Sequence, residues 1–414
     1  MAQLSDDCFA FGGALLTLDA ARAMIAAQVR RVDGTERVGL HAADGRVLAT
    51  DVTASVDLPP FDNSAVDGYA VRLAGLEDGG RLPVLGRLAA GTPARPLIDG
   101  SAQRIFTGAA LPPGADTVFM QEDVRLDAGH VQLPPGLRPG ANTRPRGEDI
   151  ARGAVALHAG LRLRPQDLAL AAALGITGLS VRRPVRVALL STGNELVEPG
   201  QFTGAAQRYD SNRVLLAAMA RRAGAQVTDL GILPDRLDAI TDALQAAARG
   251  HDLVLTSGGV SAGEEDHVRA AVEAMGSLVF WRLAVKPGRP VSMGMVGGVP
   301  FMGLPGNPVA AFVTFAQLTR PMLAALAGSA FQPPPVLHLP AAFAYRKKAG
   351  RREYVRARLL PGPDGVVAAH KHGVDGAGIL TSLTETDGLV ELADDVTRVA
   401  PGDAVAFMPY SLLF

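Results

Sequence analysis

Five short segments of this 414-residue chain combine glycine or proline with polar and charged side chains. Each follows a stretch with strand-like hydrophobic patterning. In an open parallel sheet, ligands bind beyond the carboxyl ends of the strands, so the loops at that edge are the candidate sites. We therefore expect one sheet edge to carry all five: Ser191–Leu196 (STGNEL), Pro234–Asp235, Thr256–Asp266 (TSGGVSAGEED), Lys286–Arg289 (KPGR) and Leu304–Pro308 (LPGNP).

The glycine-rich loop has the chemistry of an anion site. Gly258 and Gly259 allow backbone amides to approach an anion closely. Ser257 and Ser261 add hydroxyl donors beside these amides. The loop therefore predicts binding of a phosphate or a similar oxyanion.

Two further loops add positive charge at the same edge. Asn307 and Pro308 have the pattern of an N-cap followed by a first-turn proline, which would direct free amides and the positive end of a helix dipole outward. Lys286 and Arg289 flank a stiff Pro-Gly turn and supply two cationic groups. The pattern predicts a highly anionic small molecule as the ligand, and Pro305 in the same motif is a further candidate substrate-binding residue.

Three carboxylates, Glu195, Asp235 and Asp266, lie in these same loops. Bare carboxylates beside phosphates repel by several kcal/mol at a low effective dielectric. A bound cation removes this conflict. Oxygen ligands without a Cys or His cluster favour Mg2+ over zinc, so we expect these three residues to serve a Mg2+ ion.

Structural interpretations compete with these functional ones. A single SGG, STG or PGNP segment is more often a plain turn or a helix cap. Glu264 and Glu265 are typical of a solvated helix start, and Phe280 and Trp281 are typical of a core. The histidines have no metal-ligand spacing, and Cys8 lacks the local signs of a nucleophile.

The loops require an α/β scaffold to position them. Between Arg186 and Gly328 the hydrophobic period alternates between strand and helix, which predicts a doubly wound domain. The expected strands are 186–191, 226–231, 252–257, 278–285 and 291–295, and the expected helices are 213–223, 237–249, 266–275 and a helix that begins at Pro308.

Other regions differ from this α/β series. Short β-type runs at 69–72, 82–88 and 117–126 indicate an inserted β-domain, and helices are expected at 17–29 and 165–174, where they could pack together. Three prolines at 333–335 precede strand-like runs at 336–339, 354–360 and 403–407. The expected architecture is α/β multidomain: a helical linking domain (1–50 and 151–185), the inserted β-domain (51–150), a central doubly wound domain (186–330) and a C-terminal β-domain (331–414).

Composition limits the classes of partner. With 48% hydrophobic and 20% charged residues the chain is typical of a globular protein, and its formal charge of -1 provides no global field for nucleic acid or an anionic membrane. The single cysteine, Cys8, excludes an internal disulfide framework and a multi-thiolate metal site. The first ten residues lack the positive start of a secretory signal, and the apolar runs are shorter than a membrane span. We expect a cytoplasmic protein.

Three long motifs precede the five loops in order. They are PPFDNSAVDGYAV at 59–71, TGAALPPGADTVFMQED at 107–123 and RPRGEDI at 144–150. With the loops, they make the chain resemble the molybdopterin molybdenumtransferase family, which includes bacterial molybdenum-insertion enzymes and the E domain of gephyrin. The resemblance covers nearly the whole chain.

This resemblance implies a reaction. Adenylylated molybdopterin and molybdate would give molybdenum cofactor and AMP, with Mg2+ required. It also implies an elongated homodimer in which the β-domain of one subunit completes the cleft of the other, and a transient contact with a molybdopterin adenylyltransferase.

The resemblance also implies roles for individual residues. Asp235 and Asp266 would hold the metal, Glu195 would hold metal or position substrate, and Asp67 would reach the reaction centre from the β-domain. The remaining implied site residues are Lys286 among the catalytic groups and, for substrate, Thr107, Asp149, Arg351 and Ser382, the last two as oxyanion contacts.

Two positions depart from the family pattern. Arg289 stands where many relatives carry Lys, and Ala310 stands where many carry Ser. Arginine keeps the charge, and backbone amides can replace the lost hydroxyl. Two alternatives stay open: a molybdopterin adenylyltransferase, although those usually have a GGTG-type loop where this chain has GGVS, and a molybdopterin-binding scaffold without turnover. The choice between molybdate and tungstate is also open.

Overall fold

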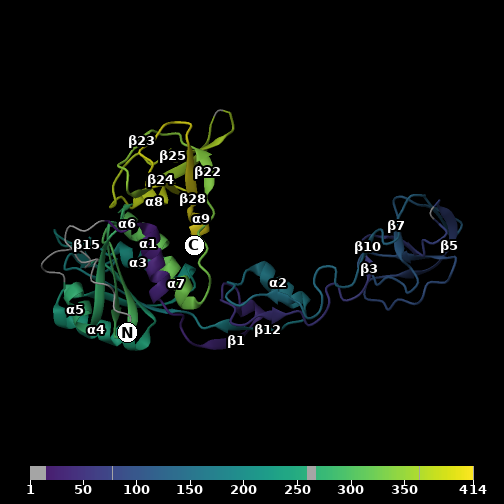
Figure 1. The fold of residues 1–414 in the computed structure, drawn as a ribbon, viewed down its shortest axis with the longest axis horizontal. Coiled ribbons are helices and arrows are strands. Elements are labelled where there is room, and N and C mark those ends of the chain that lie inside the picture. Colours follow the sequence, from purple (N-terminus) through teal and green to yellow (C-terminus); the bar gives the residue numbers. More distant parts are fainter. Residues whose placement is uncertain (1–14, 77, 259–266, 363, 414) are drawn as a thin grey trace. The chain divides into compact units, whose positions relative to one another are not determined.

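The computed structural model describes residues 15–76, 78–258, 267–362 and 364–413 (Figure 1). Contacts divide the chain into two compact units, one made of residues 1–36 and 182–414 and the other of residues 37–181. The α/β multidomain class is confirmed, because both units contain mixed sheets with helices.

A six-stranded sheet forms the centre of the first unit. Its spatial order is β16-β13-β17-β21-β20-β18. The first four strands run parallel, β20 is antiparallel to β21, and β18 is antiparallel to β20. The bounds are β13 Arg186–Thr192, β16 Gln226–Leu233, β17 Leu253–Ser257, β18 Gly276–Arg282, β20 Pro290–Val296 and β21 Val299–Leu304.

Strand β21 is absent from the sequence prediction, although it is central in the sheet. Its sequence VPFMGL is short and contains Pro300 and Gly303, which weaken a strand signal. The two glycines Gly297 and Gly298, both with positive φ, turn the chain from β20 into β21. This hairpin makes the sheet mixed instead of fully parallel.

The sheet directions explain why the loops gather. β18 runs in the same sense as β21, because each is antiparallel to β20. The segment after β18, residues 286–289, therefore leaves the same edge as the segments after β13, β17 and β21. The loops after these strands therefore leave one edge of the sheet, although the sheet is not fully parallel.

Helices cover both faces of this sheet. Ala188, Leu190 and Val254 pack with α4 (Leu237–Gly250) and α5 (His267–Met275). The intervening residues of β13 and β17, which face the other side of the sheet, are also buried. Helix α3 (Ser211–Arg222) contacts β13 and β16. Burial of successive residues on both faces is typical of a doubly wound domain.

The helix predicted from Pro308 is long. It comprises α6 (Pro308–Thr314), a π-helical segment η3 (Phe315–Thr319) and α7 (Arg320–Ala327). Its 20 residues are apolar enough to span a membrane, which corrects the expectation that no run is long enough, but 83% of the apolar window is buried inside the protein. Such burial is typical of the core helix of a soluble protein.

Helix α1 (Leu18–Gln28) packs against α7. The helix at 165–174 belongs to the other unit, so its expected packing with α1 stays a prediction. Arg22 of α1 donates to the Gln317 carbonyl over 3.0 Å, and Leu18, Ala21 and Ile25 are buried. The apolar face of α1 is too small to identify its partner from the sequence. The contact assigns α1 to the first unit.

A second sheet of the same unit has the order β19-β24-β26-β28-β22, with β25 on β24. Strand β19 (Val285–Lys286) comes from the central domain and pairs in parallel with β24, which places Lys286 opposite Glu353. This pairing joins the KPGR segment to the C-terminal sheet. The other bounds are β22 Leu337–Pro340, β24 Arg352–Pro361, β25 Val367–Lys371, β26 Gly388–Leu392 and β28 Ala404–Pro409.

The second unit contains a six-stranded sheet of order β7-β4-β6-β5-β9-β8 and a separate small core. The small core brings Leu48 together with Leu163 and Val181, which joins residues before and after the inserted sheet. The domain limits remain a prediction. The sheet strands are β4 Gly68–Val71, β5 Gly80–Leu88, β6 Ala102–Ile105, β7 Thr117–Met120, β8 Arg125–Asp127 and β9 His130–Leu133, so the expected run 117–126 is two strands.

Short elements complete the two units. In residues 35–182 they are β1 Thr35–Gly39, η2 Leu40–Ala42, β2 Val52–Thr53, β3 Asn63–Ser64, β10 Thr143–Arg144, β11 Val155–Leu157, α2 Pro165–Ala173 and β12 Gly178–Arg182. In the remaining chain they are β14 Leu196–Val197, β15 Arg208–Tyr209, β23 Tyr345–Arg346, α8 Thr381–Thr384, β27 Arg398–Val399 and α9 Tyr410–Leu413.

Replacement of Asp252 by Asn is expected to destabilise the first unit at neutral pH. Asp252 precedes β17 and accepts two bonds from Arg183, at 2.6 and 2.8 Å, and one from the Arg186 amide at 2.8 Å. Burial raises the pKa of Asp252, but the bonds from Arg183 and Arg186 outweigh it and hold the pKa below 3.8. Charged hydrogen bonds of this kind contribute about 2 kcal/mol.

The sign of the pH dependence follows from the lowered pKa. The contribution is fully present above the unfolded-state value and is lost as the pH falls through the folded-state pKa. Urea unfolding followed by the fluorescence of Trp281, the single tryptophan, should show the difference between wild type and Asp252→Asn at pH 7 and a smaller difference at pH 3. An equal difference at both pH values would contradict the assigned ion pair.

Candidate functional site

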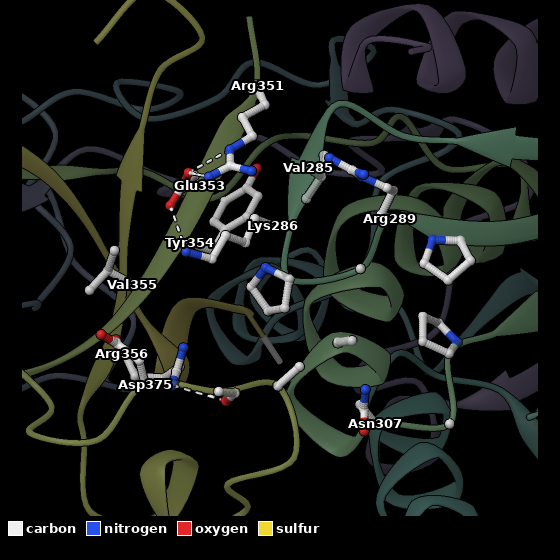
Figure 2. Close-up of a pocket in the computed structure, with 18 of the residues that line it drawn as sticks. Val285, Lys286, Arg289, Asn307, Arg351, Glu353, Tyr354, Val355, Arg356 and Asp375 are labelled. Carbon is white, nitrogen blue, oxygen red and sulfur yellow. Dashed lines mark hydrogen bonds and ion pairs between the residues drawn. The ribbon is translucent and has the colours of Figure 1, made fainter. Parts of the chain in front are cut away.

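A cavity of about 500 Å3 lies between the central sheet edge and the C-terminal sheet (Figure 2). It contains six residues that the sequence identified from four separate segments. The structure therefore brings together the KPGR and LPGNP segments and an arginine more than forty residues farther along the chain. These six are Gly258, Lys286, Arg289, Pro305, Asn307 and Arg351.

A buried carboxylate organises one wall of this large cavity. Glu353, 1% exposed, accepts from Arg351 at 2.6 Å and from the Tyr345 hydroxyl at 2.8 Å. The Lys286 ammonium lies 3.4 Å from the same carboxylate and 3.3 Å from the Tyr345 hydroxyl (Figure 2). These contacts fix the positions of Lys286 and Arg351.

The same contacts keep Lys286 charged. Burial lowers the pKa of Lys286, but the Tyr345 hydroxyl and the Glu353 carboxylate outweigh it and raise the pKa above its usual value. Burial raises the pKa of Tyr345, which therefore stays a neutral donor to Glu353. The wall presents an ammonium and a guanidinium to the cavity at neutral pH.

Sequence reasoning missed Glu353, Tyr345 and Arg356, which all line the large cavity. A signal exists in the segment REYVRARLL, because charged residues interrupt an apolar strand at Glu353 and Arg356. Charges within a buried strand are rare unless they are paired or functional. The pairing of β24 with β19, which carries Lys286, could not be read from local patterning.

Ser382, expected as an oxyanion contact, is fully buried. Its hydroxyl accepts from Arg356 Nε at 3.0 Å and donates to the Ile379 carbonyl at 2.5 Å. It is not among the residues that line the large cavity. Ser382 therefore contacts Arg356, which lines the large cavity, and does not line the cavity itself.

A second cavity of about 220 Å3 adjoins the first at Gly258, Gly306 and Asn307. Glu195 lines it, and Arg208 pairs with that carboxylate over 2.8 Å. Ser257 and Pro308 line it as well. The predicted carboxylate and the predicted anion loop therefore meet in this small cavity.

Asn212, also missed from the sequence, braces the small cavity. Its amide nitrogen donates to Ser257 Oγ at 2.9 Å and to the Gly306 carbonyl at 2.9 Å. Because the Asn212 amide donates to Ser257, the serine hydroxyl keeps its own hydrogen for another acceptor. The brace links the loop after β17 to the loop after β21.

The helix start at Asn307 and Pro308 is confirmed as the N-cap and first-turn positions of α6. The Asn307 side chain makes no capping hydrogen bond. The Val309 amide donates to the Ala377 carbonyl at 3.0 Å, so one amide expected to be free for an anion is already used. The departure Ala310 lines the large cavity without a hydroxyl.

The predicted metal residues have different placements. Asp235 follows β16, whose Leu233 is the register partner of Thr192 on β13, so Asp235 and Glu195 leave neighbouring strand ends. Asp235 lines neither cavity. Asp266, with Gly259 and Ser261, lies outside the described residues. Within the described part of the chain, no group of three His, Cys, Asp or Glu residues is placed to hold a metal ion.

In the second unit, Asp67 and Thr107 form a pair. The Thr107 amide and hydroxyl each donate to Asp67 Oδ1 at 2.8 Å. These two bonds hold the pKa of Asp67 below its usual value, so it is an anion at neutral pH. Asp149 is exposed, and its amide donates to the Leu58 carbonyl.

Comparisons with known proteins agree with this geometry. Three family models match in order: the MoeA N-terminal region (domain I and II) at residues 16–175, a probable molybdopterin binding domain at 188–325 and the MoeA C-terminal region (domain IV) at 338–410. Together they cover most of the chain.

Whole-chain relatives agree as well. The molybdopterin molybdenumtransferase of Haemophilus influenzae is 38% identical over 402 residues, which is 96% of this chain and 100% of the relative. The enzyme of the same name from Nostoc is 35% identical over 90% of this chain and 88% of its own. The crystal structure of a molybdopterin biosynthesis MoeA protein from Pyrococcus horikoshii OT3 has a TM-score of 0.80 at 29% identity and covers 96% of this chain and 100% of its own. The chain therefore belongs to the molybdopterin molybdenumtransferase family, transferases of molybdenum cofactor biosynthesis.

Proposed function

We propose that this protein inserts molybdenum into molybdopterin, with adenylylated molybdopterin and molybdate as substrates and molybdenum cofactor and AMP as products. The charge of the large cavity is the observation that supports the proposal most directly. Four cationic side chains and two carboxylates line it, which leaves two positive charges in excess. Molybdate is a tetrahedral dianion of matching charge.

The two adjoining cavities suit the two parts of such a reaction. The large cavity, with Lys286 and Arg289, would bind molybdate. The small cavity, with Ser257, Glu195 and Asn307, would bind the phosphates of the adenylylated substrate. Two of the three residues that line both cavities, Gly258 and Gly306, have no side chain, so molybdate and the phosphates could approach one another closely there.

Mg2+ is the cation that we propose beside the small cavity, because the residues that line this cavity offer oxygen donors and include neither histidine nor cysteine. Glu195 lines the small cavity, and Asp235, which lines neither cavity, and Asp266 would supply the other carboxylates. When bound, the ion would neutralise phosphate charge. Ser257, held as a donor by Asn212, would bind a phosphate oxygen, and Lys286 would neutralise charge that develops as the link to AMP breaks.

The family resemblance also supports a cytoplasmic homodimer and a transient contact with a molybdopterin adenylyltransferase. In the dimer, Asp67 and Thr107 of one subunit would complete the cleft of its partner. Asp149 would contact the substrate.

Release of AMP tests the proposal. Purified protein is mixed with adenylylated molybdopterin, Mg2+ and either molybdate or tungstate, and AMP and cofactor are measured together. We expect both products in equal amounts, and only when the oxyanion is present. Binding of the adenylylated substrate without release of AMP would favour the scaffold alternative and contradict the proposed turnover.

A further inference from the structure

Arg208 is the one cationic side chain among the described residues that line the small cavity. It lies on β15, and its guanidinium bonds the Glu195 carboxylate at 2.8 Å. The second carboxylate in the lining, Asp210, is 2% exposed and pairs with Arg213 at 3.0 Å. The side chains of the small cavity therefore carry no excess of positive charge, unlike those of the large cavity.

This charge balance is unfavourable for the phosphates that the small cavity is proposed to bind. The Ser257 hydroxyl can donate to a phosphate oxygen, but it carries no charge, and a charged donor forms a stronger bond. A carboxylate that faces the same oxygens repels them. Phosphate binding is favoured when Arg208 exchanges the Glu195 carboxylate for a phosphate oxygen.

The geometry of Arg208 allows such an exchange. Its backbone is fixed, because its amide donates to the Glu195 carbonyl at 2.8 Å and Leu196 is its register partner on β14. Its side chain is 65% exposed, and within the described part of the chain only one guanidinium nitrogen, Nη2, has an acceptor. An exposed ion pair contributes less than about 1 kcal/mol, so the guanidinium can leave Glu195 at little cost.

Glu195 can in turn bind a different cation. A Cβ at Gly193 would lie 2.5 Å from Glu195 Oε2, so the glycine leaves room for the carboxylate to lie close to the backbone. The carboxylate is thereby held beside Arg208, and it is also one of the groups proposed to bind Mg2+. Arg208 and Mg2+ therefore compete for the same oxygens.

We propose that Arg208 is a phosphate-binding residue that exchanges partners: it pairs with Glu195 in the free protein and binds a phosphate oxygen of the adenylylated substrate when Mg2+ takes the carboxylate. The inference rests on the proposed function and adds a residue to the proposed phosphate site. Mg2+ binding releases Arg208 for the phosphate, and phosphate binding releases Glu195 for Mg2+. The two ligands therefore bind cooperatively.

Calorimetry of AMP and Mg2+ binding to the full-length protein tests the exchange without turnover. Arg208→Gln should weaken AMP binding in the presence of Mg2+ by about tenfold, because a charge-assisted contact is lost. The same variant should bind Mg2+ without AMP about two- to fivefold more tightly, because the competing ion pair is absent. These opposite effects distinguish the exchange from a structural role, which would weaken both kinds of binding or neither.

Two variants control for charge. Arg208→Lys keeps the charge without the planar fork, so its AMP affinity should lie between those of the wild type and Arg208→Gln. Arg236→Gln removes an exposed cation that follows β16 at the same edge of the sheet. Arg236 lines neither cavity, so this variant should bind AMP and Mg2+ like the wild type.

A double variant tests the link between the two residues. Glu195→Gln should strengthen AMP binding in the absence of Mg2+, because it frees Arg208. Most of this gain should be lost when Glu195→Gln is combined with Arg208→Gln. An equal gain in both backgrounds would mean that Glu195 affects AMP only through its own charge, and it would overturn the exchange.

Three further results would overturn the inference. They are wild-type AMP affinity in Arg208→Gln, Mg2+ binding by that variant that is no tighter than wild type, and absence of AMP or Mg2+ binding by the wild type. Melting temperatures without ligands show whether each variant is folded. AMP release decides the proposed function separately, so AMP binding that depends on Arg208 in a protein without turnover would support the phosphate contact alone.

Discussion

Replacement of Arg213 by Met is expected to destabilise the first unit by about 3–5 kcal/mol, because it leaves a buried carboxylate without its partner. Arg213 lies in the first turn of α3 with 7% of its side chain exposed. Its guanidinium bonds three carboxylates: Asp210 at 3.0 Å, and Glu198 and Asp229 at 2.5 Å. Asp210 is 2% exposed, so among the three carboxylates it would lose the most stabilisation when its cationic partner is removed.

The effect should extend to the small cavity. Glu198 lies three residues after Glu195, and the segment between β13 and α3 is held to the helix by Asp210 and Glu198. Arg213→Met should therefore weaken substrate binding as well as folding. Arg222→Met, an exposed change on the same helix, is the matched control and should leave both unchanged.

Urea unfolding followed by Trp281 fluorescence measures the stability of both variants. Burial raises the pKa of Asp229, but the bond from Arg213 outweighs it and lowers the pKa below its usual value. This contribution is present at neutral pH and is lost as the pH falls through the folded-state pKa. If Arg213→Met lowered the free energy of unfolding by less than about 1 kcal/mol at pH 7, the three carboxylates would not depend on Arg213 for their stability in the folded protein.

The sequence predicted the sheet edge because the required signals are local. A strand with continuous apolar character, such as β13 or β17, and a following glycine or proline loop specify where a side chain leaves the sheet. Lys286, Asn307 and Ser257 were placed in this way. The prediction was insensitive to the missed β21, since Asn307 follows that strand in any case.

The missed residues depend on pairings between distant segments. Glu353 meets Lys286 only because β19 leaves the central domain and joins β24, and no local pattern encodes that partner. Arg356 could be identified as a charge in an apolar strand, but its lack of a carboxylate partner is visible only in three dimensions. Asn212 illustrates the same limit, because its two acceptors lie 45 and 94 residues away.

Asp235→Asn is expected to raise the Mg2+ concentration needed for half-maximal AMP release by at least about tenfold while the protein folds normally. The amide is nearly isosteric with the carboxylate but lacks the charge that binds Mg2+. Loss of a supporting group around a metal already costs about 10- to 100-fold in affinity, and loss of a ligand should cost no less. Glu195→Gln and Asp266→Asn should behave in the same way.

Asp238→Asn is the matched control for this series. Asp238 is an exposed carboxylate three residues after Asp235, in the first turn of α4, where it pairs with Arg236. Its replacement removes the same charge close to the sheet edge without touching the proposed ligands, so its Mg2+ titration should match that of the wild type. If Asp238→Asn shifted the titration as far as Asp235→Asn, the effect would be general electrostatics. If Asp235→Asn matched the wild type at limiting Mg2+, Asp235 would not be a ligand, and its position outside both cavities would mark it as part of the turn after β16.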